Sequence, residues 1–369
     1  MKTKEKIINF IKSEVVLSVA IVLAIITCFF VPPDKEYLGY FDYSTLICLF
    51  CMLAVVAGLK STNVFELISR KLIGLFHTRR AVIYALVFGT FFFDMIVAND
   101  MSLITFLPLT YIVLHSTKND KYLAFTFIMQ TIAANMGGMI TPYGNPQNLY
   151  LYSYYNINTT EFFSILLVPS ITVAVLLWIC CAFVHNEPLK LRKNSKIIIS
   201  KKELCIYSIL FIFVILSIFR VIPYLITLAI VVLTILIMDR KRFKQIDYAL
   251  IATFFVFFVF SGNIARIPAI KEFISEIVVK NTLLAGIVSC QFISNVPTAI
   301  FLSKFTTNYK ELLVSVNIGS LGILISSLAS LITLKEFLKH QPNNFWKYLI
   351  MYTIFNTLFL VVLLLVTTL

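Results

Sequence analysis

The sequence predicts an all-α, polytopic membrane protein built from two inverted repeats, and three observations support this fold class. Hydrophobic residues make up 59% of the 369 residues and charged residues 13%, with a mean hydropathy of +0.91, whereas soluble domains carry about 25% charged residues. Apolar runs long enough to cross a bilayer recur along the whole chain. The order of these runs and of their polar interruptions also occurs twice, which indicates an internal repeat.

Nine apolar runs have the length of a membrane span. They lie near 14–31, 43–59, 121–141, 164–184, 204–219, 222–238, 247–261, 311–332 and 345–367. The first is too long for the apolar core of a signal peptide and lacks a small-residue cleavage site, so we interpret it as a retained helix. Two more stretches, 81–114 and 282–303, are broken in the middle by polar residues. The segment 63–80 alternates apolar and charged residues, which predicts a helix lying in the membrane interface.

The distribution of basic residues predicts the topology. Of the 31 Lys and Arg residues, 24 fall in six segments that can all be placed in the cytoplasm, namely 1–13, 60–80, 115–121, 185–203, 239–247 and 333–347. Membrane proteins concentrate Lys and Arg in cytoplasmic loops, so the N-terminus is predicted inside and the C-terminus outside. This assignment works only if each broken stretch enters and leaves on one side. Stretches 81–114 and 282–303 are therefore predicted to be re-entrant hairpins from opposite faces.

Composition also excludes several function classes. The net charge of +13 does not indicate nucleic-acid binding, because the basic residues sit in short segments rather than on one face. Cys48 and Cys51 have C-x-x-C spacing but no second pair and no nearby His, so no metal site is predicted there. Nothing resembles a hydrolase triad or a phosphate-binding loop, so the chain is not expected to be an enzyme. The expected partners are membrane lipid and a small solute.

The repeat divides the chain into three parts. The first repeat is 1–184, with a hairpin at 81–114 and a broken helix at 121–149. Residues 185–221 form a cytoplasmic loop and a linking helix, and the second repeat is 222–369, with a hairpin at 282–303 and a broken helix at 311–332. Residues 135–149 align without a gap on 317–331. Broken helices at mid-membrane leave backbone groups without partners, and paired breaks in two halves are the best sequence indication of a transport site.

The same segments carry a family resemblance. Residues 98–108, 135–148, 289–297 and 317–331 resemble the citrate-transporter-like branch of the ion transporter superfamily, which includes divalent anion:sodium symporters and arsenite permeases. The chain is most similar to compact bacterial anion-permease-like inner-membrane proteins, and the resemblance covers nearly its whole length. It implies a secondary active transporter of the elevator type, working as a homodimer in the bacterial inner membrane. It further implies transport of a small anion coupled to sodium ions or protons, with no other cofactor.

The resemblance also implies the site residues. Asn99 and Asn295 match the hairpin-tip asparagines, and two sodium sites would draw on Asn99, Gly144, Asn145, Asn295 and Ser326. The predicted substrate and ion site comprises Asn99, Asp100, Ser102, Gly144, Asn145, Asn148, Ser294, Asn295, Thr298, Ser326, Ser327 and Ser330. The two tips read Ala-Asn-Asp and Ser-Asn-Val where the symporters carry Ser-Asn-Thr, so dicarboxylate specificity is not implied. A proton-driven efflux permease for arsenite or a similar oxyanion or neutral solute is therefore the alternative.

Two acids stand out in the first hairpin. Asp94 and Asp100 lie in a stretch without Lys or Arg between residues 81 and 117, and an unpaired carboxylate in a membrane costs at least a few kcal/mol. Each is a candidate cation ligand or proton carrier, with Asp100 the favoured coupling acid. The structural alternative is a hydrogen bond, for instance Asp100 capping a helix that starts at Met101. A channel or a non-transporting receptor is the alternative from another class, although no polar stripe follows any spanning helix.

Overall fold

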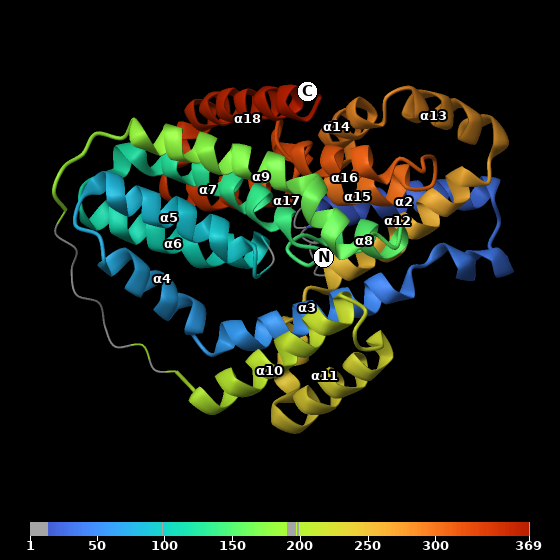
Figure 1. Cartoon of the computed structure of the whole chain (residues 1–369), viewed down its shortest axis with the longest axis horizontal. Coiled ribbons are helices and arrows are strands. Elements are labelled where there is room, and N and C mark those ends of the chain that lie inside the picture. The colour runs from blue at the N-terminus through green and yellow to red at the C-terminus, as the bar shows by residue number, and fades with distance from the viewer. Residues whose placement is uncertain (1–13, 98, 190–196, 198, 369) are drawn as a thin grey trace, which may run out of the picture.

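The computed structural model describes residues 14–97, 99–189, 197 and 199–368, and apart from one isolated β-bridge the regular secondary structure of this part is helical (Figure 1). The helices of the first half are α2 Val15–Phe30, α3 Tyr43–Ser61, α4 Val64–Gly74, α5 Arg79–Asp94, α6 Asn99–Ser116, α7 Leu123–Gly137, α8 Pro146–Tyr154 and α9 Thr159–Ala182. Those of the second half are α10 Lys201–Ile218, α11 Tyr224–Met238, α12 Tyr248–Ala265, α13 Pro268–Lys280, α14 Thr282–Ile293, α15 Asn295–Leu302, α16 Tyr309–Ile318, α17 Leu328–His340 and α18 Phe345–Thr368. Three predicted features, the basic segment 1–13, tip residue Ala98 and the basic residues within 190–196, lie outside the described residues.

The helices have the length and composition of a membrane protein. Within the described residues, five segments are long and apolar enough to span a bilayer: α3, α9, α12, and α7 and α18 with their flanking turns. A sixth is present if the bent pair α13 and α14 counts as one span, and α2 and α11 are shorter apolar helices. The predicted class, a nearly all-helical polytopic membrane protein, is therefore confirmed.

The helices form two groups. In the first, which we call the scaffold group, α12 packs on α2, and α10 and α11 pack on α3. The approach of α3 to α10 is close, because a Cβ added to Gly58 would lie 2.1 Å from the ring of Tyr207. The second, which we call the core group, contains α5 to α9 and α14 to α18, with α5 and α6 both packed on α7 and with α14 packed on α16. Figure 1 shows α10 and α11 at the lower edge of the molecule, away from α18 at the upper edge.

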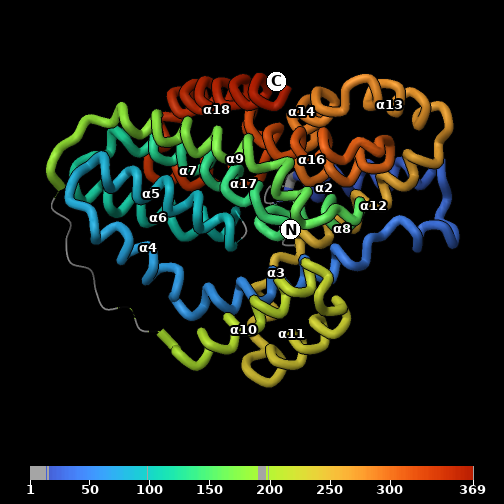
Figure 2. The backbone as a smooth tube through the Cα atoms, viewed as in Figure 1, coloured from blue at the N-terminus to red at the C-terminus, as the bar shows by residue number. Residues whose placement is uncertain are grey.

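Two surface helices join the scaffold group to the core group. Figure 2 traces the chain from α3 through α4 into α5, and again from α12 through α13 into α14. Helix α4 is the amphipathic helix predicted within 63–80, and it ends at Gly74. The hydropathy pattern did not predict helix α13. Its one buried residue is Val278, and its axis is bent by 117° from that of α14.

Both predicted broken helices are interrupted in the structure. Helix α7 ends at Gly137 and α8 begins at Pro146, while α16 ends at Ile318 and α17 begins at Leu328. The gapless alignment pairs Pro146 with Leu328, so both halves resume at aligned positions. Each interruption contains one short 3-10 turn, at Gly138–Ile140 and Leu324–Ser326. Most residues of both unwound segments are buried, although Ile323 and Ile325 of the second segment are exposed.

The two hairpin stretches are pairs of contacting helices. In the first, α5 ends at Asp94 and α6 begins at Asn99; in the second, α14 ends at Ile293 and α15 begins at Asn295. Ser294 makes the second turn with φ of 73°, a positive value that is uncommon outside glycine. The start of α5 is fastened to the loop after α9, because Arg79 is ion-paired with Glu187. Re-entry of each pair into the bilayer from one face stays a prediction.

Candidate functional site

The end of α5 is bonded to both neighbouring parts of the first half. Asp94 is fully buried, and its Oδ1 accepts a hydrogen bond from Ser102 Oγ of α6 at 2.8 Å. Its Oδ2 accepts from the backbone N–H of Gly138, in the interruption after α7, at 2.6 Å. One residue on, the carbonyl of Met95 accepts from Thr141 Oγ1 at 3.1 Å. The hairpin and the broken helix of the first half therefore meet at Asp94.

Three oxygen atoms converge beside Gly138. A Cβ added to this glycine would lie 2.6 Å from Asn145 Oδ1, 2.7 Å from Asp94 Oδ2 and 2.9 Å from the carbonyl oxygen of Gly144. Gly138 has an ordinary helical φ of −67°. Glycine is therefore needed here because the three oxygens lie so close to the backbone, and not because of the backbone conformation. Asn145 Oδ1 is buried and has no hydrogen-bond partner among the described residues. We call Asp94, Gly144 and Asn145 the oxygen cluster; carboxylate and carbonyl oxygens are the ligands that hard cations prefer.

The tip of the second hairpin meets the second interruption through neutral groups. Ser294 Oγ donates to the carbonyl of Ser326 at 3.3 Å, and Thr298 Oγ1 donates to the carbonyl of Ser294 at 2.7 Å. Ser327 Oγ and Ser330 Oγ lie 3.0 Å apart, and Tyr352 OH of α18 donates to Ser330 Oγ at 2.6 Å. The residues predicted for this half of the site therefore lie together, as a network of hydroxyl groups and carbonyls.

Two asparagines connect the interrupted helices. Asn317 Nδ2 of α16 donates to Asn148 Oδ1 of α8 at 2.7 Å. Asn148 Nδ2 in turn donates to the carbonyl of Met139 at 2.9 Å, and to those of Gly138 and Thr141 at 3.3 Å each. Asn148, predicted as a site residue, thus holds the unwound backbone in place and joins the two halves.

The predicted tip residues of the first hairpin are less enclosed than Asp94, whereas Asn295 of the second hairpin is buried. Asn99 and Asp100 are both partly exposed, and Asn99 Oδ1 accepts from the backbone N–H of Asp100 at 3.1 Å. Asp100 Oδ1 is a buried atom without a partner among the described residues, and no capping bond from this side chain appears there. Asn295 Oδ1 accepts from the N–H of Val296 at 2.9 Å. Within the described residues no hydrogen bond joins Asn99 to Asn295, so the tips are not in direct polar contact.

Two buried amides were missing from the predicted site. Asn135 of α7 and Gln147 of α8 are each 1% exposed, and both polar side-chain atoms of each lack partners among the described residues. A buried polar group without a partner costs about 1–3 kcal/mol, which favours water or a bound solute beside them. A sequence signal existed for both, because Gln147 lies inside the Gly144–Asn148 motif and Asn135 aligns with Asn317.

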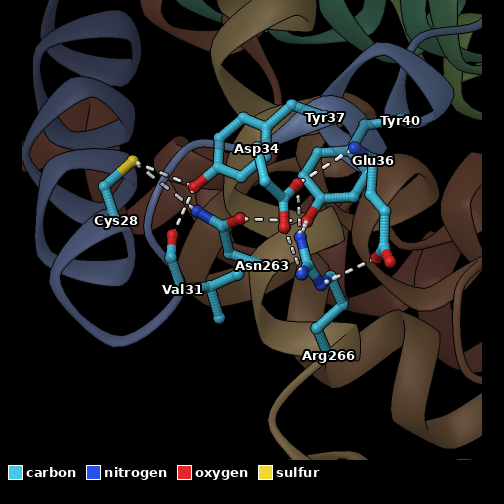
Figure 3. A network of polar contacts seen from close by, with 8 residues as sticks. All are labelled: Cys28, Val31, Asp34, Glu36, Tyr37, Tyr40, Asn263 and Arg266. Atoms are coloured by element: carbon cyan, nitrogen blue, oxygen red, sulfur yellow. Dashed lines mark hydrogen bonds and ion pairs between the residues drawn. The ribbon is translucent and has the colours of Figure 1, made fainter.

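A separate polar network covers the end of α12 (Figure 3). Arg266 Nη2 lies 2.6 Å from Asp34 Oδ2, and Arg266 Nε lies 3.1 Å from Glu36 Oε2. The hydrogen bond to Arg266 lowers the pKa of the Asp34 carboxyl, and the same bond raises the pKa of Arg266. Tyr40 OH donates to Asn263 Oδ1 at 3.2 Å and lies 3.0 Å from Arg266 Nη1. Arg266 is therefore paired with two acids at the surface of the scaffold group and is not a free cation that could attract a solute.

The apolar helices define a polytopic membrane protein, and comparison with known proteins identifies it as a transporter and gives its family. The chain matches the citrate transporter family over residues 6–317, and it belongs to that family. It is 34% identical to the uncharacterized transporter MJ0456 of Methanocaldococcus jannaschii over 298 residues, covering 80% of this chain and 81% of that protein. It is 24% identical to the inner membrane protein YbiR of Escherichia coli over 327 residues, covering 87% of this chain and 86% of that protein.

A weaker similarity links the chain to a third protein. It is 26% identical over 144 residues to the putative transporter arsB of Dictyostelium discoideum, covering 37% of this chain and 24% of that protein. The predicted family is thus confirmed, as is the prediction that the chain is a membrane transporter and not an enzyme.

Proposed function

We propose that this protein is an ion-coupled secondary transporter in which Asp94 binds the coupling cation. One observation carries the proposal: a fully buried carboxylate shares the oxygen cluster with two further acceptor oxygens, and no ion pair to Asp94 occurs within the described residues. The sequence places no Lys or Arg in 81–117, 122–189, 281–303 or 311–334, the stretches that build both hairpins and both interruptions.

The physical reason is the cost of the bare charge. An isolated carboxylate inside a protein or a membrane is strongly unfavourable, and it is neutralised by a cation or by a proton. With a cation bound, the cluster is neutral and can cross the low-dielectric region; empty, it carries a negative charge that opposes the same movement. This difference is what couples a solute to an ion gradient. The geometry favours Asp94 over Asp100, because only Asp94 is fully enclosed with two other acceptor oxygens.

We further propose that the core group moves against the scaffold group in an elevator-like step. The support is the division of the helices into two groups joined through the surface helices α4 and α13. The matched restarts at Pro146 and Leu328 support two inverted repeats that would give opposite-facing states. We also propose a homodimer formed by the scaffold groups. Cysteine cross-linking of single-cysteine variants on α10 and α11 in native membranes tests this assembly, and its absence at every position would contradict it.

For the solute, a small anion is the first candidate. Backbone N–H groups at the starts of α6, α8, α15 and α17 supply partial positive charge that suits an anion. The second candidate is a neutral or weakly acidic oxyacid such as arsenite, which the absence of Lys and Arg from 135–154 and 281–303 favours. Similarity to a protein named as a putative arsB transporter points the same way.

The proposal is tested with purified protein in proteoliposomes. Uptake of citrate, sulfate, phosphate or arsenite is measured under an imposed sodium gradient, an imposed proton gradient, or neither. We expect one gradient to drive accumulation, and we expect Asp94→Asn to abolish that drive. Asp100→Asn tests the other candidate acid of the same hairpin, and we expect it to keep gradient-driven uptake. Gradient-driven uptake that persists in Asp94→Asn would contradict the assigned role. Uptake that ignores both gradients in the wild type would indicate a channel.

A further inference from the structure

The two hairpins carry different residues at matching positions. Asp94 stands five residues before the tip residue Asn99, and Cys290 stands five residues before the tip residue Asn295. The packing around them is also matched. A Cβ added to Gly137 would lie 3.1 Å from Asp94 Cβ, and one added to Gly319 would lie 3.1 Å from Cys290 Cβ. Cys290 therefore occupies in the second half the place that Asp94 occupies in the first.

The remaining parts of the oxygen cluster are also replaced in the second half. The gapless alignment pairs Gly138 with Ser320, so the second half carries a side chain at the position where the first half has none. Ser320 Oγ donates to the carbonyl of Asn317 at 2.6 Å, and the carbonyl of Ser320 accepts from Ser326 Oγ at 2.6 Å. In the first half, by contrast, Asn145 Oδ1 lacks a partner among the described residues.

No carboxylate compensates for the cysteine. Between residues 281 and 334 the one acid is Glu311, near the start of α16. Its Oε2 accepts from the backbone N–H of Leu283 at 3.1 Å, at the far end of α14 from the tip. A neutral thiol is a weak acceptor, and hard cations select carboxylate and carbonyl oxygens over sulfur. At the second interruption the hydroxyl groups of Ser320, Ser326 and Ser327 all have hydrogen-bond partners. Asn317 Oδ1 is a buried amide oxygen without a partner among the described residues, but no carboxylate lies beside it.

From these differences we propose that the two half-sites are electrically unequal: the first binds the single coupling cation through Asp94, and the second, with Cys290 in the matching place, binds none. The inference rests on the proposed function and adds the number of coupled cations to it. One positive charge would enter the core group in each transport cycle.

The number of cation sites can be counted without knowing the solute. Proteoliposomes are adsorbed to a solid-supported membrane, and the charge displaced by a jump from choline chloride to sodium chloride, or by a pH jump, is recorded without any solute. We expect one of these jumps to displace charge in the wild type. Asp94→Asn should abolish the displacement, while Cys290→Ala should leave its full amplitude. Two equivalent sites would instead leave each variant with about half of the wild-type charge.

Further variants separate a folding defect from a lost site. Ser102→Ala removes one hydrogen bond to Asp94 but keeps the charge, so it should raise the half-saturating cation concentration and retain the amplitude. Size-exclusion profile and thermal unfolding establish that each variant is folded. Residual charge in folded Asp94→Asn, or a reduced amplitude in Cys290→Ala, overturns the unequal-site inference and leaves ion coupling standing. A wild type that responds to neither jump overturns the proposed function together with this inference.

Discussion

Replacing Gly138 by alanine adds one methyl group at the point where the oxygen cluster converges. The new carbon would lie 2.6, 2.7 and 2.9 Å from the oxygens of Asn145, Asp94 and Gly144. Ordinary contact begins at 3.4 Å, so the three oxygens would have to withdraw by 0.8, 0.7 and 0.5 Å, the differences from that distance. Withdrawal of Asp94 also lengthens its 2.6 Å hydrogen bond from the backbone N–H of Gly138.

The expected magnitudes follow from two opposing effects. Overpacking a well-filled interior costs about 1–3 kcal/mol, and alanine returns about 0.5–1 kcal/mol over glycine in a helical conformation. The free energy of unfolding should therefore fall by no more than about 2.5 kcal/mol. Cation affinity receives no such compensation, because the methyl group occupies the binding volume itself. We expect a loss of affinity of at least about tenfold, equivalent to about 1.4 kcal/mol.

The assay is the half-saturating cation concentration in charge-displacement recordings, with Tm measured on the same preparations. Gly74→Ala is the matched control, because a Cβ added to Gly74 has nothing within 4 Å. It should leave both quantities close to wild type. If Gly138→Ala binds the coupling cation with wild-type affinity, the oxygen cluster is not the cation site and the reasoning from its geometry is refuted.

Three further predictions concern contacts outside the oxygen cluster. Asn317→Ala removes the bond between the interrupted helices and should lower stability by about 1 kcal/mol, seen as a Tm decrease of a few degrees; an unchanged Tm would contradict this. Because Arg266 lowers the pKa of Asp34, that ion pair stabilises the fold above about pH 4 and is lost as pH falls through the lowered pKa. The Tm values of wild type and Asp34→Asn should therefore differ at pH 6 and converge in stronger acid, whereas a constant difference would count against the pair. Gly58→Ala should destabilise the scaffold group by about 1–3 kcal/mol through collision with Tyr207, and Tyr207→Ala in the same background should recover part of the loss.

Much of the fold is readable from local sequence. The helix order, the amphipathic helix after α3, and the breaks near Asn145 and Ser327 all follow from hydropathy and from polar residues inside apolar runs. The physical reason is that a bilayer tolerates unpaired backbone groups only where protein or water satisfies them. A helix break inside the membrane therefore tends to carry polar residues or Gly and Pro, which can be recognised within an apolar run. Helix α13 was not predicted, because its short sequence of mixed apolar and charged residues resembles neither a membrane span nor a loop.

The roles of individual side chains within the site could not be read in the same way. Sequence alone favoured Asp100, since it lies at the predicted tip, while the structure encloses Asp94 against Gly138, 44 positions along the chain. It likewise neutralises Arg266 with Asp34, 232 positions away. Hydropathy records where a segment lies relative to the membrane, whereas the charge a site can hold depends on distances between segments far apart in sequence.

The sequence by itself thus determined a polytopic transporter with two interrupted helices, because solvation by lipid acts on each segment separately. Only the tertiary structure decided which acid is enclosed by acceptor oxygens, and that Cys290 stands in the matching place of the other half. Those facts depend on how α5, α7 and α14 pack, which no single segment encodes.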